Sequence, residues 1–214
     1  MYSPQKWSHR LMIICLSSLS GIIAPVIFLL VVITIDAIQP EHNPIVETIS
    51  ELVHGSYGWV QTLAFFLLGF LLIVFAARLY ISTIKKITSQ VGTLLVILTG
   101  LGFFLLGAFP SQTSVSELKT QQIVHDAAAG IIGTSFILGC LAYAVHFRLD
   151  PQWRKYWIYS VITVLLCTLF GLLWAFTPLN LQARGIDQLL LLVCGLLWVE
   201  IISIRLLKTC LGKA

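Results

Sequence analysis

Six long apolar runs constrain this chain more than any other feature. A helix needs about 20 predominantly apolar residues to cross a bilayer, and six stretches come close to or exceed that length: about 11–38, 59–82, 91–109, 125–147, 156–178 and 187–208. Of all residues, 58% are hydrophobic and 10% are charged, whereas soluble domains are about 25% charged. The sequence therefore predicts an all-α, polytopic membrane bundle of six transmembrane helices, organised as a single domain over residues 1–214.

Positive charge is distributed unevenly around these runs. Two basic residues precede the first run, and three each lie around the junction of runs two and three, around the junction of runs four and five, and at or beyond the end of run six, which makes 11 of the 13 Lys and Arg residues. Cytoplasmic loops carry such an excess, so we expect a multi-pass cell-membrane protein with both termini and the 83–90 loop in the cytoplasm. The net charge of +4 is a topology signal, because no basic patch interleaved with aromatic residues suggests nucleic-acid binding.

A polar stretch, His42–Gly55, separates the first two runs. Asn43 can cap a helix, Pro44 fits its first position, and Gly55 can end it, which predicts a short amphipathic helix in the first outer loop. At 3.6 residues per turn, its two faces would carry Ile45, Ile49, Leu52 and Val53 on one side and Glu47, Ser50, Glu51 and His54 on the other. The polar face either lines a site or faces water and lipid headgroups.

The fourth run opens with His125 and Asp126, followed by small residues. Both polar residues belong to the same predicted end of the bundle as the polar stretch, and neither suits a lipid-facing position. We therefore expect His125 to lie near Ser50 or His54, with the His125–Asp126 start of this small-residue helix packed tightly against that stretch. The candidate catalytic residues are His54, His125, Glu47, Ser50 and Asp126.

Neutral imidazoles together with carboxylates also suit a divalent metal such as zinc. The candidate ligands are His54, His125 and Asp36. Asp36, near the outer end of the first run, either reaches the headgroups or faces the same cavity as the polar stretch.

The last apolar run contains two further acidic residues. Glu200 lies well inside it, and an intramembrane carboxylate is a functional candidate by default. Arg205, Arg78 or His146 could instead neutralise Glu200 in a structural pair. Asp187, near the outer start of the run, either caps the helix or pairs with Arg184.

The five cysteines lie in apolar runs or near their inner ends. Their number is odd, and no two are spaced as Cys-x-x-Cys. We therefore expect buried structural thiols, without a disulfide framework or a zinc–thiolate site.

Two segments carry a resemblance. The His-Asn-Pro and Ile-Ser-Glu-Leu elements between His42 and Leu52, and the stretch from Gly100 to Pro110 followed by His125, resemble a family of six-helix prokaryotic membrane proteins known as a domain of unknown function. The resemblance covers about 20–208. Residues 185–188 read Gly-Ile-Asp-Gln where the family tends to have Gly-Leu-x-Glu-Arg. The family is placed with DRAM-like and Frag-like membrane proteins, some linked to lipid or glycolipid handling.

Two classes of function follow. The first is a lipid-binding, regulatory or assembly protein in which the outward-facing polar residues form a network, with membrane lipid as the partner. The second is a membrane-embedded enzyme that acts on a lipid or lipid-linked substrate at the outer leaflet, with His54 or His125 as general base or metal ligand. A transporter that uses Glu200 is a third hypothesis. It is less favoured, because the two halves of the sequence show no internal repeat. The sequence leaves the oligomeric state open.

Overall fold

The computed structural model describes residues 9–111, 119–176 and 183–212, and they form an all-helical bundle. The elements in chain order are α1 His9–Ile38, η1 Ile49–His54, α2 Gly58–Ser82, α3 Ile87–Ala108, α4 Lys119–Leu149, η2 Arg154–Tyr156, α5 Trp157–Phe176 and α6 Arg184–Leu211. Each of the six α-helices is long and apolar enough to cross a membrane. The predicted fold class is therefore confirmed. Several helices begin before their apolar runs, because polar residues extend them beyond the membrane-spanning part.

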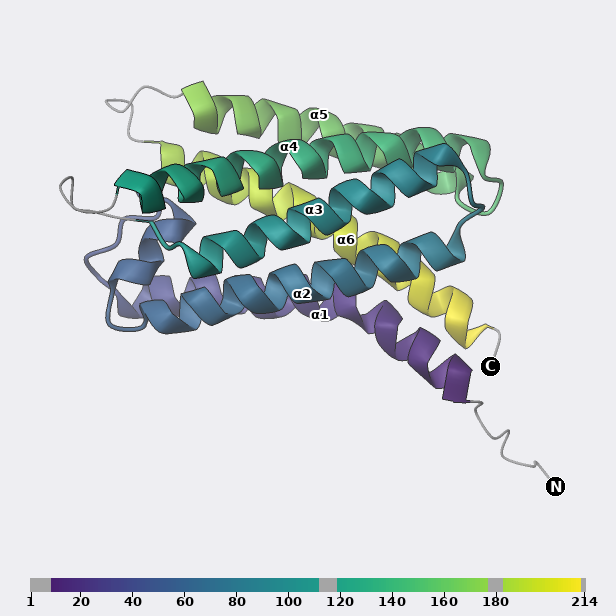
Figure 1. Ribbon diagram of the computed structural model, residues 1–214, viewed down its shortest axis with the longest axis horizontal. Helices are drawn as coiled ribbons and strands as arrows, with labels where there is room; N and C mark the ends of the chain where they lie inside the picture. Colours follow the sequence, from purple (N-terminus) through teal and green to yellow (C-terminus); the bar gives the residue numbers. More distant parts are fainter. Residues whose placement is uncertain (1–8, 112–118, 177–182, 213–214) are drawn as a thin grey trace.

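The six helices form a ring. Each helix packs against its neighbours in the sequence, and α6 closes the ring by packing against α1. Successive helices run in opposite directions (Figure 1), so the first turn of α1 and the last turn of α6 lie at the same end, which we call the terminal end. The opposite end, which contains η1, the end of α3 and the starts of α4 and α6, is called the η1 end.

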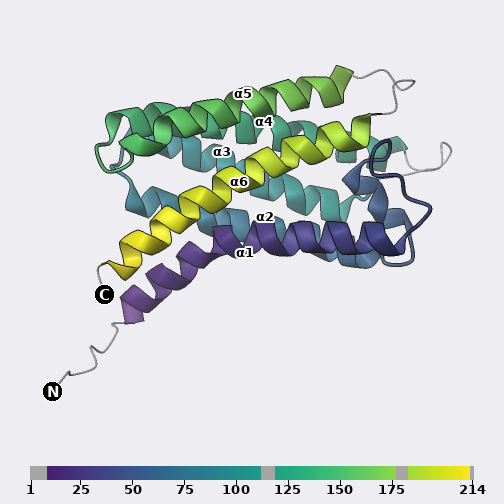
Figure 2. The same ribbon diagram turned by 180° about the vertical axis from the view of Figure 1, so that it is seen from behind.

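Helices α1 and α6 are the least regular members of the ring. Helix α6 crosses the bundle diagonally, from α1 at the terminal end to α5 at the η1 end (Figure 2). Helix α1 bends along its length in the same view and contains Pro25. A proline cannot donate the hydrogen bond to the carbonyl four residues earlier, which bends a helix. The bend lets the first turns of α1 follow the end of α6.

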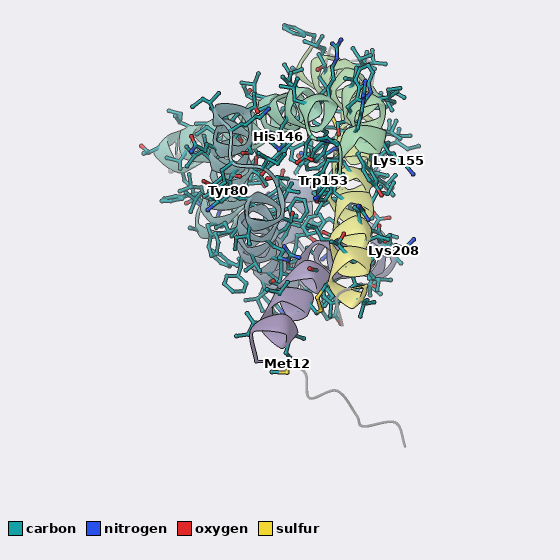
Figure 3. All side chains as sticks on the ribbon, turned by 90° about the vertical axis from the view of Figure 1, so that its right-hand side faces the viewer. Met12, Tyr80, His146, Trp153, Lys155 and Lys208 are labelled. Carbon is teal, nitrogen blue, oxygen red and sulfur yellow. A yellow bond between two sulfur atoms is a disulfide. The ribbon has the colours of Figure 1, made fainter. Side chains whose placement is uncertain are left out.

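Aromatic side chains pack at several levels of the bundle. Phe28, Phe65 and Phe103 meet in the η1 half, and a second group extends from the middle toward the terminal end. Trp198 of α6 is fully buried; its ring meets those of Phe75 and Phe136 edge-on, and its Nε1–H donates to Ser160 Oγ (2.9 Å). Phe147 stacks on Trp153 nearer the terminal end. Figure 3 looks onto that end, with Trp153 among the helices and the basic side chains toward the outside. Those labelled there are Lys155 and Lys208.

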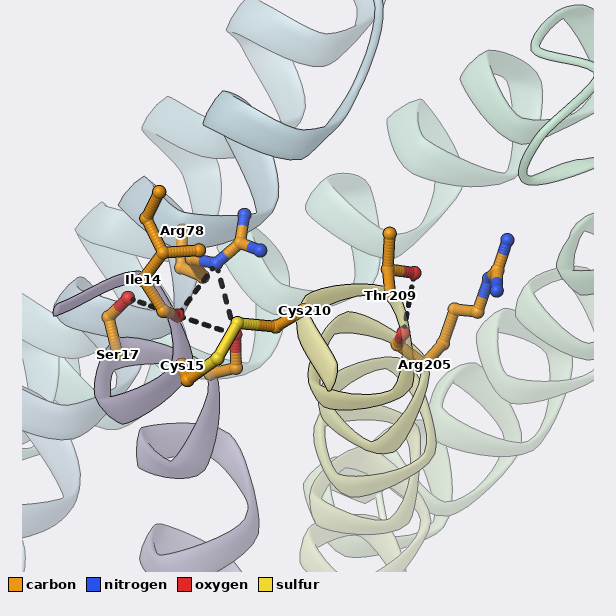
Figure 4. The surroundings of a disulfide bond; sticks show 8 residues. Ile14, Cys15, Ser17, Arg78, Arg205, Thr209 and Cys210 are labelled. Atoms are coloured by element: carbon orange, nitrogen blue, oxygen red, sulfur yellow. Dashed lines mark hydrogen bonds between the residues drawn. A yellow bond between two sulfur atoms is a disulfide. The ribbon is translucent and has the colours of Figure 1, made fainter. Parts of the chain in front are cut away.

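A disulfide bond joins α1 to α6 at the terminal end. Cys15 and Cys210 are bonded, with their Cα atoms 5.6 Å apart (Figure 4). Beside them, Arg78 Nε donates to the Ile14 carbonyl (3.2 Å) and to Ser18 Oγ (3.0 Å). The expectation that all five cysteines are thiols was wrong for this pair. The two residues are 195 apart in the sequence, and only the closure of the ring brings them together.

Candidate functional site

A cavity of about 730 Å³ lies in the η1 half of the bundle, bordered by the η1 region and by α2 to α6. Small-molecule sites are typically about 300–1,000 Å³. Its inner part, at the middle of the bundle, is lined by apolar side chains, among them Phe65, Leu72, Phe136, Leu196 and Val199. Its mouth, at the η1 end, is lined by Glu47, Glu51, Gln122, His125, Asp126 and Arg184. The cavity is thus polar at one end and apolar at the other.

Glycines of α4 and α5 give the cavity its width. A Cβ atom built on Gly130 or Gly133 of α4 would meet no atom within 4 Å, and one on Gly171 of α5 would meet its nearest neighbour at 3.9 Å. All three residues line the cavity. Gly130 and Gly133 therefore border open space.

The polar stretch between α1 and α2 forms two separate turns where the sequence predicted one helix. The Asn43 carbonyl accepts the N–H groups of Val46 (3.0 Å) and Glu47 (2.8 Å), which closes the first turn. Thr48 then caps η1: the Glu51 carboxylate accepts its backbone N–H and its hydroxyl. This capping box starts a new 3₁₀ helix at Ile49, with about three residues per turn.

The predicted polar face is divided as a result. Glu47, Ser50 and Glu51 line the cavity, whereas His54 is exposed and is not one of the lining residues. On the predicted apolar face, Ile49 and Leu52 are buried, but Ile45 is 55% exposed.

Backbone hydrogen bonds fix this segment on the start of α6. The Ile45 carbonyl accepts the N–H groups of Gly185 (3.0 Å) and Ile186 (3.2 Å), and the Gln188 side chain accepts the N–H of Ile49 (2.7 Å). A Cβ atom on Gly185 would lie 2.3 Å from the Glu47 carbonyl oxygen, so the contact requires glycine. Helix N-termini leave N–H groups without partners inside the helix, and here the loop supplies acceptors for two of them.

His125 is held by the end of α3. Its Nδ1 lies 2.8 Å from the Phe109 carbonyl oxygen. Because a carbonyl can only accept, Nδ1 carries a proton, so in the neutral form of the ring Nε2 is the nitrogen with the lone pair. The side chain is 4% exposed and lines the cavity, and Nε2 has no hydrogen-bond partner among residues 9–111, 119–176 and 183–212.

Ser111 links the same segment to η1. Its hydroxyl donates to the Ser50 carbonyl (2.9 Å). Its oxygen lies 3.1 Å from His54 Nε2 and accepts a hydrogen bond from it, so His54 carries a proton on Nε2. Ser111 and the Phe109 carbonyl thus connect η1 to α4 across the mouth. His125, Ser50 and Glu47 therefore line one cavity. His54 bonds to Ser111 and does not line the cavity.

The candidate metal ligands lie in three separate settings. Asp36 Oδ1 pairs with His42 Nδ1 at 2.7 Å, His54 bonds to Ser111, and His125 bonds to the Phe109 carbonyl. Within the described ranges, no three His, Cys, Asp or Glu side chains are grouped so that they could hold a metal ion. Zinc needs three or four such ligands at one point, and these residues do not fit it.

Four charged side chains of the described residues line the cavity: Glu47, Glu51, Asp126 and Arg184. The three carboxylates form hydrogen bonds with uncharged groups. Glu47 accepts from the Asn43 backbone N–H (2.8 Å), and Asp126 accepts from the Gln122 side-chain amide (2.7 Å). The Arg184 guanidinium lies over the Trp174 ring, 5.8 Å from its centroid. It forms no salt bridge within the part of the chain that the structure describes. Among the described residues, the mouth therefore carries three negative charges and one positive charge.

Glu200 lies outside this site. It is partly buried on α6 and forms no salt bridge with any described residue. The three residues proposed to neutralise it form other hydrogen bonds. Arg78 donates to α1, His146 bonds to Thr88 (3.1 Å), and Arg205 donates to the Gln152 carbonyl (3.5 Å).

Sequence reasoning missed several residues of the site. Arg184 was considered only as a partner of Asp187, and Ser111 was not singled out. Gly130 and Gly133 lie three residues apart on one face of α4, a spacing that could have indicated an open face as well as a packed one.

The chain belongs to the family described as "Protein of unknown function (DUF998)", whose model matches residues 22–205. This match includes both segments that carried the resemblance. Searches among curated proteins and among solved structures found no match.

Proposed function

We propose that this member of the family is a lipid-binding membrane protein that holds an amphiphile in the cavity, with its chain in the apolar part and its headgroup at the mouth. The observation that carries the proposal is the order of the lining, polar at the η1 end and apolar toward the middle. An amphiphilic lipid in one leaflet has its polar and apolar parts in the same order.

The depth of the cavity suits a single leaflet. His125 and Phe136 both line it, and eleven residues of α4 span about 16 Å. This is about half of the roughly 30 Å hydrocarbon core. With the basic residues in the cytoplasm, as the distribution of Lys and Arg favours, the mouth lies at the outer leaflet of the cell membrane.

Selectivity in such a site comes from shape and from the headgroup. A lipid chain that enters the cavity leaves hydrocarbon and not water, so it gains little from the hydrophobic effect. The open volume beside Gly130 and Gly133 supplies the shape, and the polar groups at the mouth supply directional contacts.

A variant that fills the cavity tests the proposal. Gly133→Leu places a side chain in space that is open around its Cβ, so the fold should tolerate it. Native mass spectrometry of protein purified in mild detergent should find retained lipid on the wild type and little on this variant. Ala127→Leu is the matched control, because Ala127 is exposed on the same helix and is not one of the lining residues.

Two results would contradict lipid binding in the cavity. One is a wild-type protein that retains no lipid, and the other is equal retention by wild type and Gly133→Leu. If Gly133→Leu does not elute as a monodisperse species, Gly130→Leu provides the same test from the next turn of α4.

An enzyme that acts on a lipid or lipid-linked substrate is a second candidate, and the lone pair of His125 Nε2 in the cavity favours it. A general base must reach the proton that it abstracts, and among the two candidate histidines only His125 lines the cavity. Incubation with extracted lipids, followed by mass spectrometry, should then show a product that disappears with His125→Ala. A wild-type protein that retains lipid and converts none contradicts the enzymatic candidate.

A further inference from the structure

We infer that the mouth of the cavity recognises a phospholipid headgroup that carries both a phosphate and a primary ammonium group. The inference rests on the proposed lipid-binding function and adds the class of headgroup. It is carried by the juxtaposition of two features at the same opening: the Arg184 guanidinium, which forms no salt bridge with any described residue, and several hydrogen-bond acceptors.

Arg184 provides the phosphate side. Its guanidinium lines the mouth and lies over the Trp174 ring, without a salt bridge to any described residue. An arginine fork binds phosphate oxygens through two parallel N–H groups. The backbone N–H groups of Gly185 and Ile186 already donate to the Ile45 carbonyl, so the side chain, and not the helix N-terminus, is the anion-binding element.

The ammonium side is formed by acceptors on the turn before η1 and on α4. Glu47 and Asp126 each present a carboxylate at the mouth, and each uses one oxygen in the hydrogen bonds to Asn43 and Gln122 described above. His125 adds the lone pair of Nε2 from a side chain that is 4% exposed. A primary ammonium group has three N–H donors, which can be shared among these acceptors.

The charge balance argues against other headgroups. An anionic head without a cation would add negative charge beside three carboxylates and a single arginine. A cationic head without phosphate would leave Arg184 unpaired. A quaternary ammonium has no N–H to donate and is recognised by aromatic cages, whereas the aromatic ring at this mouth, Trp174, already lies under Arg184.

A competition among three lipids with identical chains tests the inference. Delipidated full-length protein is given equal amounts of phosphatidylethanolamine, phosphatidylcholine and phosphatidylglycerol in detergent, and bound species are counted by native mass spectrometry. We expect phosphatidylethanolamine to exceed each of the others by about tenfold, the equivalent of one charge-assisted hydrogen bond. Glycerophosphoethanolamine, which has the head without the chains, should not displace it at the same concentration.

Variants test which residues bind the ammonium group and which residue binds the phosphate. Glu47→Gln combined with Asp126→Asn should abolish the preference for phosphatidylethanolamine and raise binding of phosphatidylglycerol. Arg184→Gln should lower the binding of all three lipids. The matched controls are Glu41→Gln and Arg154→Gln, since both residues are exposed and neither lines the cavity.

The outcomes separate this inference from the function on which it rests. If no lipid binds, or if Gly133→Leu binds lipid like the wild type, the proposed function fails. If binding is lost in Gly133→Leu but the three lipids bind equally, or phosphatidylglycerol binds best, the headgroup inference is wrong and the lipid-binding function stands. If glycerophosphoethanolamine displaces the lipid, the ligand is a soluble phosphoamine and the lipid assignment is wrong.

Discussion

The two ends of the bundle are built from the same helices, but α4 is packed differently at each of them. Helix α4 presents Gly130 and Gly133 to open space near the η1 end, and Tyr143 and Phe147, both fully buried, toward the terminal end. Whether a helix closes a core or borders a cavity is therefore decided within a few turns. The terminal half, called the filled half here, is packed along α4. In the η1 half α1, α2 and α3 pack Phe28, Phe65 and Phe103 together, and the space for a ligand lies beside α4.

Polar groups differ between the ends in the same way. In the filled half several are paired within the protein: Thr93 and Tyr143 share a hydrogen bond of 2.6 Å, and Arg78 is bound by α1. The Ser203 hydroxyl is an exception, because it is buried there without a hydrogen-bond partner among the described residues. At the η1 end, His125 and Arg184 retain hydrogen-bonding capacity that no described residue uses. Internally paired polar groups stabilise a fold, whereas those with spare capacity at a cavity are available to a ligand.

The largest effect should come from removing Trp198, the largest fully buried side chain among the described residues. Trp198→Ala deletes a fully buried ring that contacts Phe75 and Phe136, and buried Trp-to-Ala changes cost about 3–5 kcal/mol. Thermal unfolding in detergent should show a large loss of stability. Trp174→Ala at the cavity wall is the matched control and should cost clearly less. Equal losses at the two positions would contradict the contrast between the ends.

The disulfide should give the next largest effect. Replacing Cys15 and Cys210 by alanine removes the bond between α1 and α6, and disulfides typically contribute about 2–4 kcal/mol. The double variant should unfold at a lower temperature, and a reductant should lower the midpoint of the wild type but not of the variant. Cys194→Ala, at a free and partly buried thiol, is the control. A wild type that is insensitive to reductant would show that the bond does not stabilise this end.

The sequence predicted the fold well because membrane spans are set by local composition. Apolar length alone identified all six helices, since a bilayer admits few alternatives to a spanning helix. The polar stretch was located correctly but was given the wrong form. Asn43 and Thr48 each start a turn, so the stretch is divided into two turns. The spacing of apolar residues at 3.6 per turn does not show where one turn ends and the next begins.

The site could be predicted only in part, because it depends on how the ring closes. His125 and Glu47 stood out as polar residues beside apolar runs, and both line the cavity. The Cys15–Cys210 bond and the position of Arg184 follow from contacts between segments far apart in the chain. The cavity was hidden for a different reason: a glycine that packs and a glycine that borders space are identical in the sequence.

The smallest predicted effects come from alanine substitutions at one glycine of each kind, a packed glycine and a glycine that borders space. A Cβ atom on Gly100 of α3 would lie 2.7 Å from the Gly69 carbonyl oxygen of α2, whereas one on Gly133 would meet nothing within 4 Å. Gly100→Ala must push two backbones apart and should cost about 1–3 kcal/mol. Gly133→Ala should instead stabilise the protein by about 0.5–1 kcal/mol, because alanine restricts the unfolded chain and favours a helix. Thermal unfolding of both variants in one detergent would show opposite signs, and a destabilised Gly133→Ala would mean that this face of α4 is packed and the cavity is absent.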